Sequence, residues 1–488
     1  MVQEQTLYQY LYETLVRKIK SGEFLQVRKL PSQKQLCQQY NVGITTVRKV
    51  MKLLQEEGYI HTTSGQSAVV IYTAPFEAYI GALVERKDEV SDAFLGLGLL
   101  LPCLYKEAIA YINTSDSILL QQAIDDIRED MDMNSLFRQP NLFLTTLIQV
   151  FDNPLIVDLE LDAENFLHIP FLPFENQTDP FYRTPSHMRN WLNSVNSCIK
   201  EQQGEVLHTK IAATYQNSRR RVMSYLEVLE KHTESPPSSS DKTICWFHIK
   251  DRLELYAHLA MTILRRIRKG EFSDQKYIPS IPKIMKEYGV MKETASRSIA
   301  LLNSLGITRT IDKKGTVILS EVPQTQTGRK DLDDPIIKQR LIYCLDALQL
   351  IALSLHSIPF DTVEKKTFAK DIQDVLQNIS TEKMYTLIIQ LSMDFIIHAV
   401  PAYSLKNIYL QLNDLLVWGY YMEAVDKSYY SDSTHTEAAI QALLTALKSE
   451  EAGSISNALQ RVFLQIYRDV YHVISKLPYD FGKLPKLI

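Results

Sequence analysis

Two hydroxyl side chains and two cations lie close together in residues 45–49, near the start of a segment with helical periodicity. These residues, Thr45, Thr46, Arg48 and Lys49, fall outside the apolar face formed by Val47, Val50, Met51 and Leu54. Hydroxyls and the N–H groups at a helix start suit phosphate oxygens or base edges, and an arginine one turn further on can reach a guanine or a phosphate. The residue types therefore predict a helix that contacts nucleic acid.

Other elements must position this helix. Residues 7–20 carry Leu or Ile at every fourth position and predict a helix that ends at Ser21–Gly22. Ser32, followed three residues later by Gln35, is a capping-box pattern that starts a short helix ending near Tyr40. The helix with the polar face ends at Gly58, and two short apolar segments on either side of residues 62–66 predict a β-hairpin.

Helix, helix, turn, helix and hairpin is the element order of a winged helix-turn-helix. In this fold the third helix can enter the major groove, which is roughly 12 Å wide. Lys34, on the second helix, and the hairpin loop with Gly65 and Gln66 are then expected to contact the phosphate backbone.

The same pattern occurs a second time in the chain. Residues 7–58 align without a gap on residues 255–306, with 17 identities in 52 positions. The shared residues include Gly22-Glu23-Phe24 with Gly270-Glu271-Phe272 and Pro31-Ser32 with Pro279-Ser280. This repeat predicts a tandem duplication of one unit.

The charge of the chain is unevenly distributed. Residues 1–72 carry nine Lys and Arg against five Asp and Glu, and residues 249–319 carry fourteen against seven. Because the net charge is −4, the remainder carries −15. Two basic segments in an acidic chain indicate local surfaces for anions.

The composition favours a mainly α fold. Only 16 of 488 residues are glycine, too few for a chain built from glycine-turned α/β nucleotide folds. We expect a winged helix-turn-helix at residues 1–74, a helical sensor and dimerisation domain at 75–234 and a Ser/Pro linker at 235–243. A second winged helix at 244–321 and a second all-helical domain at 322–488 follow. Each winged helix is expected to carry a small β-hairpin.

The first unit resembles the DNA-binding domain of the GntR family of bacterial transcriptional regulators. The resemblance rests on LPSQKQLCQQYNVGITTVRKVMKLLQEEGYI followed by SGQSAVVI, about 65 residues. It implies DNA contacts from Lys34, Thr45, Thr46, Arg48 and the wing at Gly65. One position departs from the family's pattern: Ile44 stands where the family usually has arginine, which argues against the family's standard operator sequence.

The second unit resembles the same domain with more divergence. Pro282, Glu293 and Ser296 stand where the first unit has Lys34, Thr45 and Arg48. Its candidate DNA contacts are Lys292, Arg297, Lys313 and Lys314. Whether this copy contacts DNA or only packs is left open, and so is the choice between DNA contact and a solvated helix end for the cluster Arg265, Arg266, Arg268 and Lys269.

The two helical regions occupy the place of the family's ligand-sensing and dimerising domain. They faintly resemble its metal-containing branch, which binds a metal through an Asp and three His. Asp394 and His398 have the i, i+4 spacing for a shared metal, and His208 stands where another ligand is expected. The two halves divide these residues, so we expect no metal or other cofactor, a hydrogen-bonded and partly buried His398, and a small-molecule effector of unknown identity.

Several classes are excluded at this stage. Five scattered cysteines without a C-x-x-C pair argue against disulfides and thiolate zinc sites. The longest uncharged apolar run, residues 93–105, has 13 residues, so no membrane span is expected. The N-terminus lacks a secretory signal, which favours a bacterial cytoplasmic location. Without a G-x-S-x-G, H-E-x-x-H or phosphate-binding loop, we expect no enzyme.

The sequence thus predicts a ligand-responsive transcriptional regulator that binds a double-stranded DNA operator. Repression is the commoner outcome in the resembled family. The two halves would form a pseudo-dimer within the chain, and a homodimer would carry four reading heads. The alternative is an interaction protein whose winged helices serve as docking or dimerisation modules.

Overall fold

The computed structural model describes most of the chain: residues 7–63, 66–131, 133–173, 179–233, 246, 255–268, 271–272, 276–304, 307–319, 335–356, 358–360, 363–378, 381–419, 434–449, 451, 453–477 and 479–488. Gly65, Lys269 and the expected linker at 235–243 lie outside these residues. Two compact units make up the chain and are described separately. The first comprises residues 1–250, 356–358 and 400–408, and the second comprises residues 251–355, 359–399 and 409–488.

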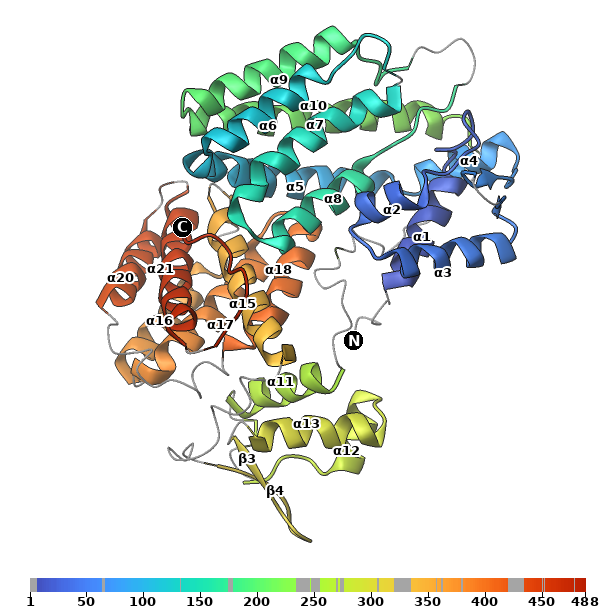
Figure 1. The fold of residues 1–488 in the computed structure, drawn as a ribbon. Coiled ribbons are helices and arrows are strands. Elements are labelled where there is room, and N and C mark those ends of the chain that lie inside the picture. The colour runs from blue at the N-terminus through green and yellow to red at the C-terminus, as the bar shows by residue number, and fades with distance from the viewer. Residues whose placement is uncertain are drawn as a thin grey trace. The chain divides into compact units, whose positions relative to one another are not determined.

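The first unit begins with three helices and a hairpin, as the sequence predicts (Figure 1). These elements are α1 (Leu7–Lys20), α2 (Gln33–Tyr40), α3 (Ile44–Glu56), β1 (Ile60–His61) and β2 (Val69–Val70). The strands are antiparallel, with Ile60 opposite Val70, and are shorter than the apolar segments that predict them. Together they form a winged helix-turn-helix over residues 7–70.

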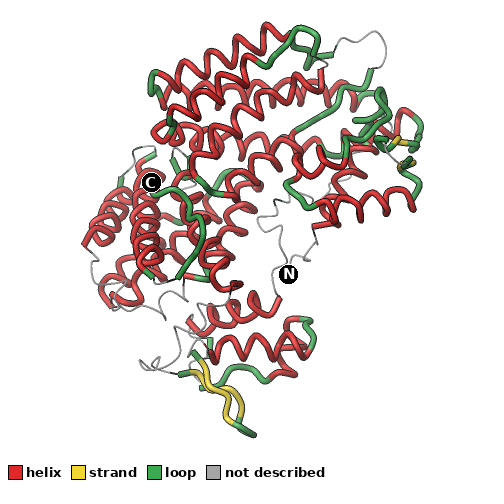
Figure 2. The backbone as a smooth tube through the Cα atoms, viewed as in Figure 1, coloured by secondary structure: helices red, strands yellow, loops and turns green. Residues whose placement is uncertain are grey.

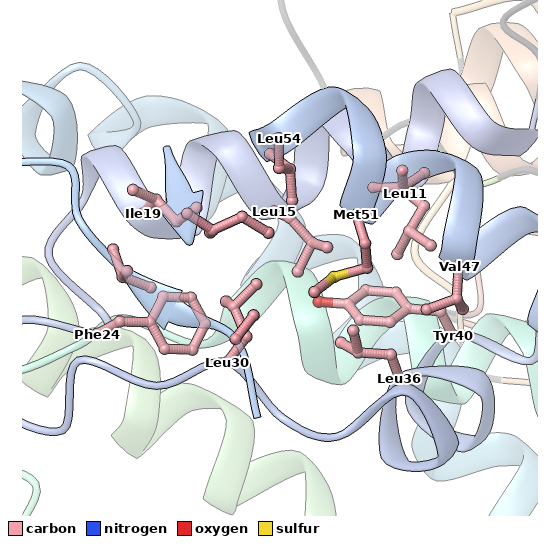
Figure 3. Packing of buried hydrophobic residues seen from close by; sticks show 14 of the residues in the cluster. Leu11, Leu15, Ile19, Phe24, Leu30, Leu36, Tyr40, Val47, Met51 and Leu54 are labelled. Atoms are coloured by element: carbon pink, nitrogen blue, oxygen red, sulfur yellow. The ribbon is translucent and has the colours of Figure 1, made fainter. Parts of the chain in front are cut away.

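A compact apolar core holds these elements together (Figure 3). Leu11, Leu15 and Ile19 from α1 meet Val47, Met51 and Leu54 from α3, and Leu36 and Tyr40 of α2 close one side. Leu11, Leu36, Val47 and Leu54 are fully buried. The apolar face of α3 is thus packed in the core, and its opposite face is left for solvent or a ligand.

The rest of the first unit is helical (Figure 2). It contains α4 (Phe76–Val84), α5 (Lys87–Ala108), η1 (Ile109–Tyr111), α6 (Thr114–Asp125), α7 (Met133–Ile148), η2 (Gln149–Phe151), α8 (Pro154–Leu167), α9 (Pro185–Lys200) and α10 (Gly204–Glu230). α5 packs along α10, with α7 and α8 also against it. Gly98 allows this close approach, since a Cβ there would meet Tyr215 Cβ at 2.9 Å.

The apolar helix α5 is longer than the uncharged run that the sequence shows. The stretch Lys87–Tyr111 is long and apolar enough to cross a membrane by length and composition, with a mean hydropathy of 1.5 in its most apolar window. The uncharged run at residues 93–105 lies within this helix, which continues through charged residues on both sides. Of that window, 67% is buried inside the structure, as in the core helix of a helical bundle.

The second unit begins with the same order of elements. These are α11 (Leu255–Arg268), α12 (Ile281–Tyr288), α13 (Lys292–Ser304), β3 (Thr308–Ile311) and β4 (Gly315–Ile318). Helices α15 (Pro335–Ser354), α16 (Lys365–Asn378), α17 (Thr381–Ala399), α18 (Tyr403–Leu416), α20 (Thr434–Lys448) and α21 (Ser454–Lys476) follow, and the first six residues of α18 belong to the first unit. α21 packs on α15 and α20, and α16 packs on α17. The described part of the chain is therefore mainly α.

Candidate nucleic-acid interface

The turn between α2 and α3 is fixed by local sequence. The backbone N–H of Ser32 donates to Gln35 Oε1 at 2.8 Å, and the N–H of Gln35 donates to Ser32 Oγ at 3.3 Å, which completes the expected capping box. α2 ends at Asn41, whose φ of 47° is left-handed, a conformation that asparagine tolerates well. Gly43 then precedes α3 and makes no side-chain cap bond to its first turn. The first N–H groups of α3 are therefore not covered by a capping side chain.

The polar face of α3 is open to solvent. Val47, Val50, Met51 and Leu54 are buried, as predicted. Thr45, Arg48 and Lys49 are exposed, and Thr46 is half-buried. Ile44, the first residue of α3, is 40% exposed. The exposed positions among residues 44–49 thus offer a hydroxyl, two cations and one apolar side chain.

Further predicted DNA contacts lie on the elements just before and just after α3 in the chain. Lys34 on α2 is exposed, and so is Gln66 in the hairpin. Gly65, at the predicted wing tip, lies outside the described residues. A side-chain bond from Thr62 to Gln55 ties the base of the hairpin to the last turn of α3. The base of the hairpin is therefore fixed beside the last turn of α3.

An aromatic ring supports one of the cations on α3. Lys49 Nζ lies 3.4 Å from the ring centroid of Tyr8 on α1. Such cation–π contacts restrict the side chain without neutralising its charge. Tyr8 was not among the predicted site residues, although its recurrence as Tyr256 in the repeat was an available signal.

Other charges in this segment have a structural role. Lys18 Nζ lies 3.1 Å from Glu23 Oε1, and both side chains are largely buried. Burial opposes the charge on each group, but their mutual attraction outweighs it, so the pKa of Lys18 is raised and the pKa of Glu23 is lowered. This pair fastens the end of α1 and is not available for a nucleic acid.

Helix α8 holds the three-helix segment against the helical part of the first unit. Tyr10 Oη donates to Asp162 Oδ1 at 2.8 Å, and Asn41 Nδ2 donates to Asp158 Oδ1 at 2.6 Å. Asn165 Nδ2 donates to the carbonyl oxygen of Gln39 at 3.0 Å. These contacts reach α1, α2 and the turn before α3. They could not be predicted from the sequence, because polar residues on a helix do not reveal distant partners.

The second unit repeats the local contacts of the first three-helix segment at the same spacing of 248 residues. Lys29 bridges Val69 in the first unit, and Tyr277 bridges Val317 in the second. The ion pair Lys18–Glu23 corresponds to Arg266–Glu271 at 2.7 Å. The bond between Gln55 and Thr62 corresponds to Asn303 Nδ2 donating to Thr310 Oγ1 at 2.8 Å. The left-handed residue Asn41 corresponds to Gly289, with φ of 65°.

The cations predicted to contact DNA in the second unit are exposed. Lys292 and Arg297 lie on α13, and Lys313 and Lys314 lie at the tip of the β3–β4 hairpin. The Arg297 guanidinium lies 4.0 Å from the ring centroid of Tyr256, the counterpart of the Lys49–Tyr8 contact. Glu293 is exposed next to Lys292, and Ser296 is half-buried.

The basic cluster at the end of α11 proves to be mixed in role. Arg266 pairs with Glu271 at 2.7 Å and with Glu287 at 2.6 Å, and it also contacts Tyr288. Arg265 lies 3.8 Å from Asp414. Neither alternative left open at the sequence level holds for Arg266, since it is neither a solvated helix end nor a free cation for DNA. Lys269 and the side chain of Arg268 are outside the described residues.

The three candidate metal ligands do not form a site in the described residues. Among these residues, no group of three or more His, Cys, Asp or Glu side chains is placed to hold a metal ion. His398 is exposed, so the expectation that it is partly buried was wrong, and its Nδ1 lies 2.7 Å from the carbonyl oxygen of Asp394. His208 is on α10, with its Nε2 3.8 Å from Cys103 Sγ.

The comparison with known families agrees with this geometry. Residues 7–70 match the family of bacterial regulatory proteins, gntR family. This segment is a GntR-family winged helix-turn-helix. Within it, α3 takes the place of the helix that enters the major groove in folds of this kind.

Two curated relatives share the GntR-family segment. The HTH-type transcriptional regulator TreR of Bacillus subtilis strain 168 is 30% identical over 78 residues, which is 16% of this chain and 33% of TreR. The uncharacterized HTH-type transcriptional regulator YurK of the same strain is 39% identical over 64 residues, 13% of this chain and 26% of YurK. The chain therefore spans a third or less of the length of these relatives.

Two solved structures match part of this chain with low TM-scores. Streptococcus agalactiae GntR is 18% identical, with a TM-score of 0.21, over 44% of this chain and 99% of that protein. E. coli McbR/YncC is 14% identical, with a TM-score of 0.23, over 46% of this chain and 98% of that protein. TM-scores this low support no conclusion about the fold of this chain.

Proposed function

We propose that this chain is a sequence-specific DNA-binding transcriptional regulator. The observation that carries the proposal is the open face of α3, where Thr45 and Arg48 are exposed at the start of a GntR-family recognition helix. Arg48 suits a guanine or a phosphate, and the hydroxyls of Thr45 and Thr46 suit phosphates or base edges. Lys34, Lys49 and the wing with Gly65 and Gln66 then position the head on the backbone. The chain acts by binding DNA and not as an enzyme.

The second part of the proposal is that residues 255–318 form a diverged second winged helix, made by tandem duplication. Support comes from the matched strand bridges, ion pairs and left-handed residues 248 positions apart. Lys292, Arg297, Lys313 and Lys314 are the proposed DNA contacts. One chain would then carry the two winged helices that two chains supply in an ordinary homodimer. A homodimer of this chain would carry four.

Regulation is proposed to act through the helical regions. A small-molecule effector that binds two arrangements of these helices unequally would shift the DNA affinity of the heads. The contacts of α8 with Tyr10 and Asn41 offer a physical route for this coupling in the first unit. We propose repression as the outcome and the bacterial cytoplasm as the location.

A specific observation keeps a second function in view. The second segment has lost the cation at the place of Arg48, where Ser296 is half-buried, and has gained Glu293. A head with these changes suits docking to a protein or dimerisation. Salt separates the two functions, because binding through several Lys and Arg contacts to phosphates weakens steeply as salt rises, and apolar docking does not.

The direct test is fluorescence anisotropy of the full chain on its own upstream promoter DNA at two salt concentrations. We expect tight, salt-sensitive binding that Arg48→Ala weakens about 5- to 150-fold, the range for one good arginine contact to a base. Arg220→Ala is the matched control, since Arg220 is exposed on α10 and its side chain donates to its neighbour Asn217. Unchanged affinity in Arg48→Ala would refute the recognition-helix assignment.

The second head has its own test. Lys292→Ala combined with Arg297→Ala should lower affinity on the same promoter and reduce the salt dependence of binding by about two ions. Lys366→Ala with Lys370→Ala removes two exposed charges from α16 and serves as the control. If the first double variant binds like the control pair, the second segment has a packing or docking role.

A further inference from the structure

The two three-helix segments can be compared residue by residue at their recognition helices. α3 and α13 begin at Ile44 and Lys292, which are 248 residues apart. The spacing holds in space as well, because Lys49 and Arg297 each lie over a tyrosine of the preceding long helix. Each residue of α3 therefore corresponds to the residue of α13 that lies 248 positions later in the chain.

What the two helices share is suited to phosphate. Lys49 and Arg297 are both cations held over a ring, and Thr46 and Thr294 are identical and half-buried. Contacts from cations and hydroxyls to phosphate oxygens position a protein on DNA without reading its sequence. The framework for backbone binding is thus retained in both segments.

What the two helices do not share is suited to bases. The first exposed residue is Ile44 in α3 and Lys292 in α13. The second is Thr45 in α3 and Glu293 in α13, and both are exposed. Both of these differences lie in the first turn, which is the part of a recognition helix that contacts base edges. One turn further on, Arg48 of α3 is replaced by Ser296 in α13.

The chemistry of these side chains assigns different bases to them. Ile44 has no donor or acceptor, and an exposed apolar side chain in the major groove pairs with the methyl group of thymine. Lys292 can donate to the O6 and N7 atoms of guanine, and Glu293 can accept from the N4 amino group of cytosine. A carboxylate near phosphates is repelled unless it finds such a donor.

We propose that the chain reads two unlike half-sites, with thymine opposite Ile44 in one and a guanine and a cytosine opposite Lys292 and Glu293 in the other. The inference rests on the proposed function of both segments as DNA readers. It replaces the palindromic operator expected for two identical heads with an asymmetric one, because operator symmetry mirrors the symmetry of the protein that reads it.

The test begins with selection of binding sites from random double-stranded DNA by the full-length chain. The expected result is a bipartite site whose halves differ. Two identical halves would overturn the inference and leave the proposed function standing. Failure to enrich any sequence, together with salt-insensitive or absent binding, would overturn the proposed function itself.

Two variants then assign each half. Glu293→Gln is expected to change the preferred base from cytosine to adenine at one position, because an amide pairs with adenine, and to leave the other half unchanged. Ile44→Arg is expected to change thymine to guanine in the other half only. The unaffected half is the internal control for folding in each variant. A switch in both halves, or in neither, would overturn the assignment.

Removal of one methyl group from the DNA tests the proposed contact between Ile44 and thymine. Replacing one thymidine with deoxyuridine removes only the methyl group that Ile44 is proposed to touch. Wild type should lose about fourfold in affinity at that position, the factor for burying one methyl group, and Ile44→Ala should lose nothing further. An equal loss in both proteins would exclude Ile44 as the reader.

Discussion

The side-chain amide of Asn41 donates to the carboxylate of Asp158 at 2.6 Å, which ties the turn before helix α3 to helix α8. Asn41 is also the residue that takes the left-handed conformation ending α2. One side chain therefore shapes the helix-turn-helix and anchors it to the helical region. The corresponding residue of the second segment is Gly289, which has the left-handed conformation without a side chain to make this bond.

Replacement of Asn41 separates its two roles. Asn41→Gly keeps the left-handed conformation and removes the bond to Asp158, whereas Asn41→Ala also adds a backbone penalty of about 1–2 kcal/mol. We expect Asn41→Gly to leave the first head folded but to raise hydrogen exchange at the α2–α3 turn. The interaction energy in a double-mutant cycle with Asp158→Ala should be about 1.5–3 kcal/mol, the range for a hydrogen bond to a charged group. Additive effects of the two changes would show that this bond does not couple the head to α8.

A buried acid on the same helix predicts a pH-dependent stability. Glu160 on α8 is 3% exposed and accepts from Tyr105 Oη at 2.6 Å. Burial raises the pKa of Glu160 to about 7, against the bond from Tyr105, which lowers it. The folded state thus retains a proton that the unfolded chain releases near pH 4.3. Its contribution to stability is complete below about pH 4.3 and is lost as the pH rises to about 7, a change on the order of 3 kcal/mol.

The measurement is thermal denaturation between pH 5 and pH 8. Glu160→Gln keeps an acceptor for Tyr105 and cannot ionise, so the variant should lose less stability over this range than wild type. Glu227→Gln, on an exposed position of α10, is the control and should follow wild type. Parallel curves for Glu160→Gln and wild type would show that Glu160 ionises normally in the fold.

The contact between Lys49 and Tyr8 predicts distinct effects on affinity and on salt dependence. Lys49→Ala should weaken DNA binding and reduce the slope of affinity against salt by about one ion, since a phosphate contact is lost. Tyr8→Leu removes only the ring beneath Lys49, so affinity should fall about 2- to 5-fold, the value of an exposed cation–π contact, with the slope unchanged. Tyr8→Phe retains the ring and should bind like wild type. A loss in Tyr8→Phe as large as in Tyr8→Leu would point to the hydroxyl instead.

The features that could be predicted from sequence are local ones. The capping box of Ser32 and Gln35 and the buried face of α3 depend on residues three or four positions apart, and both are found as expected. The antiparallel hairpin is also found, with shorter strands, because only part of each apolar segment pairs.

The features that could not be predicted depend on distant partners. Nothing near Asp158 in the sequence indicates that it meets Asn41, and nothing near Arg266 indicates that Glu287 and Tyr288 surround it. His398 was expected to be partly buried, yet it lies on the exposed side of α17. Its position in a basic cluster at a helix end predicted that Arg266 is a surface cation. In the fold, acidic and aromatic side chains surround it.

Arg266 is therefore predicted to stabilise the second segment without contacting DNA. Its guanidinium pairs with Glu271 and Glu287 and lies 4.9 Å from the ring centroid of Phe272, with the side chain 24% exposed. Arg266→Ala leaves two carboxylates without their cation, so we expect a loss of about 1–2 kcal/mol, between the values for surface and buried pairs. Arg266→Lys reproduces the residue found at the same place in the first segment, Lys18, and should lose less. Hydrogen exchange along α11 and α12 measures this stability, and the salt slope of DNA binding should stay constant. A reduced slope, like the one expected for the double variant Lys292→Ala with Arg297→Ala, together with unchanged exchange would instead assign Arg266 to the DNA surface.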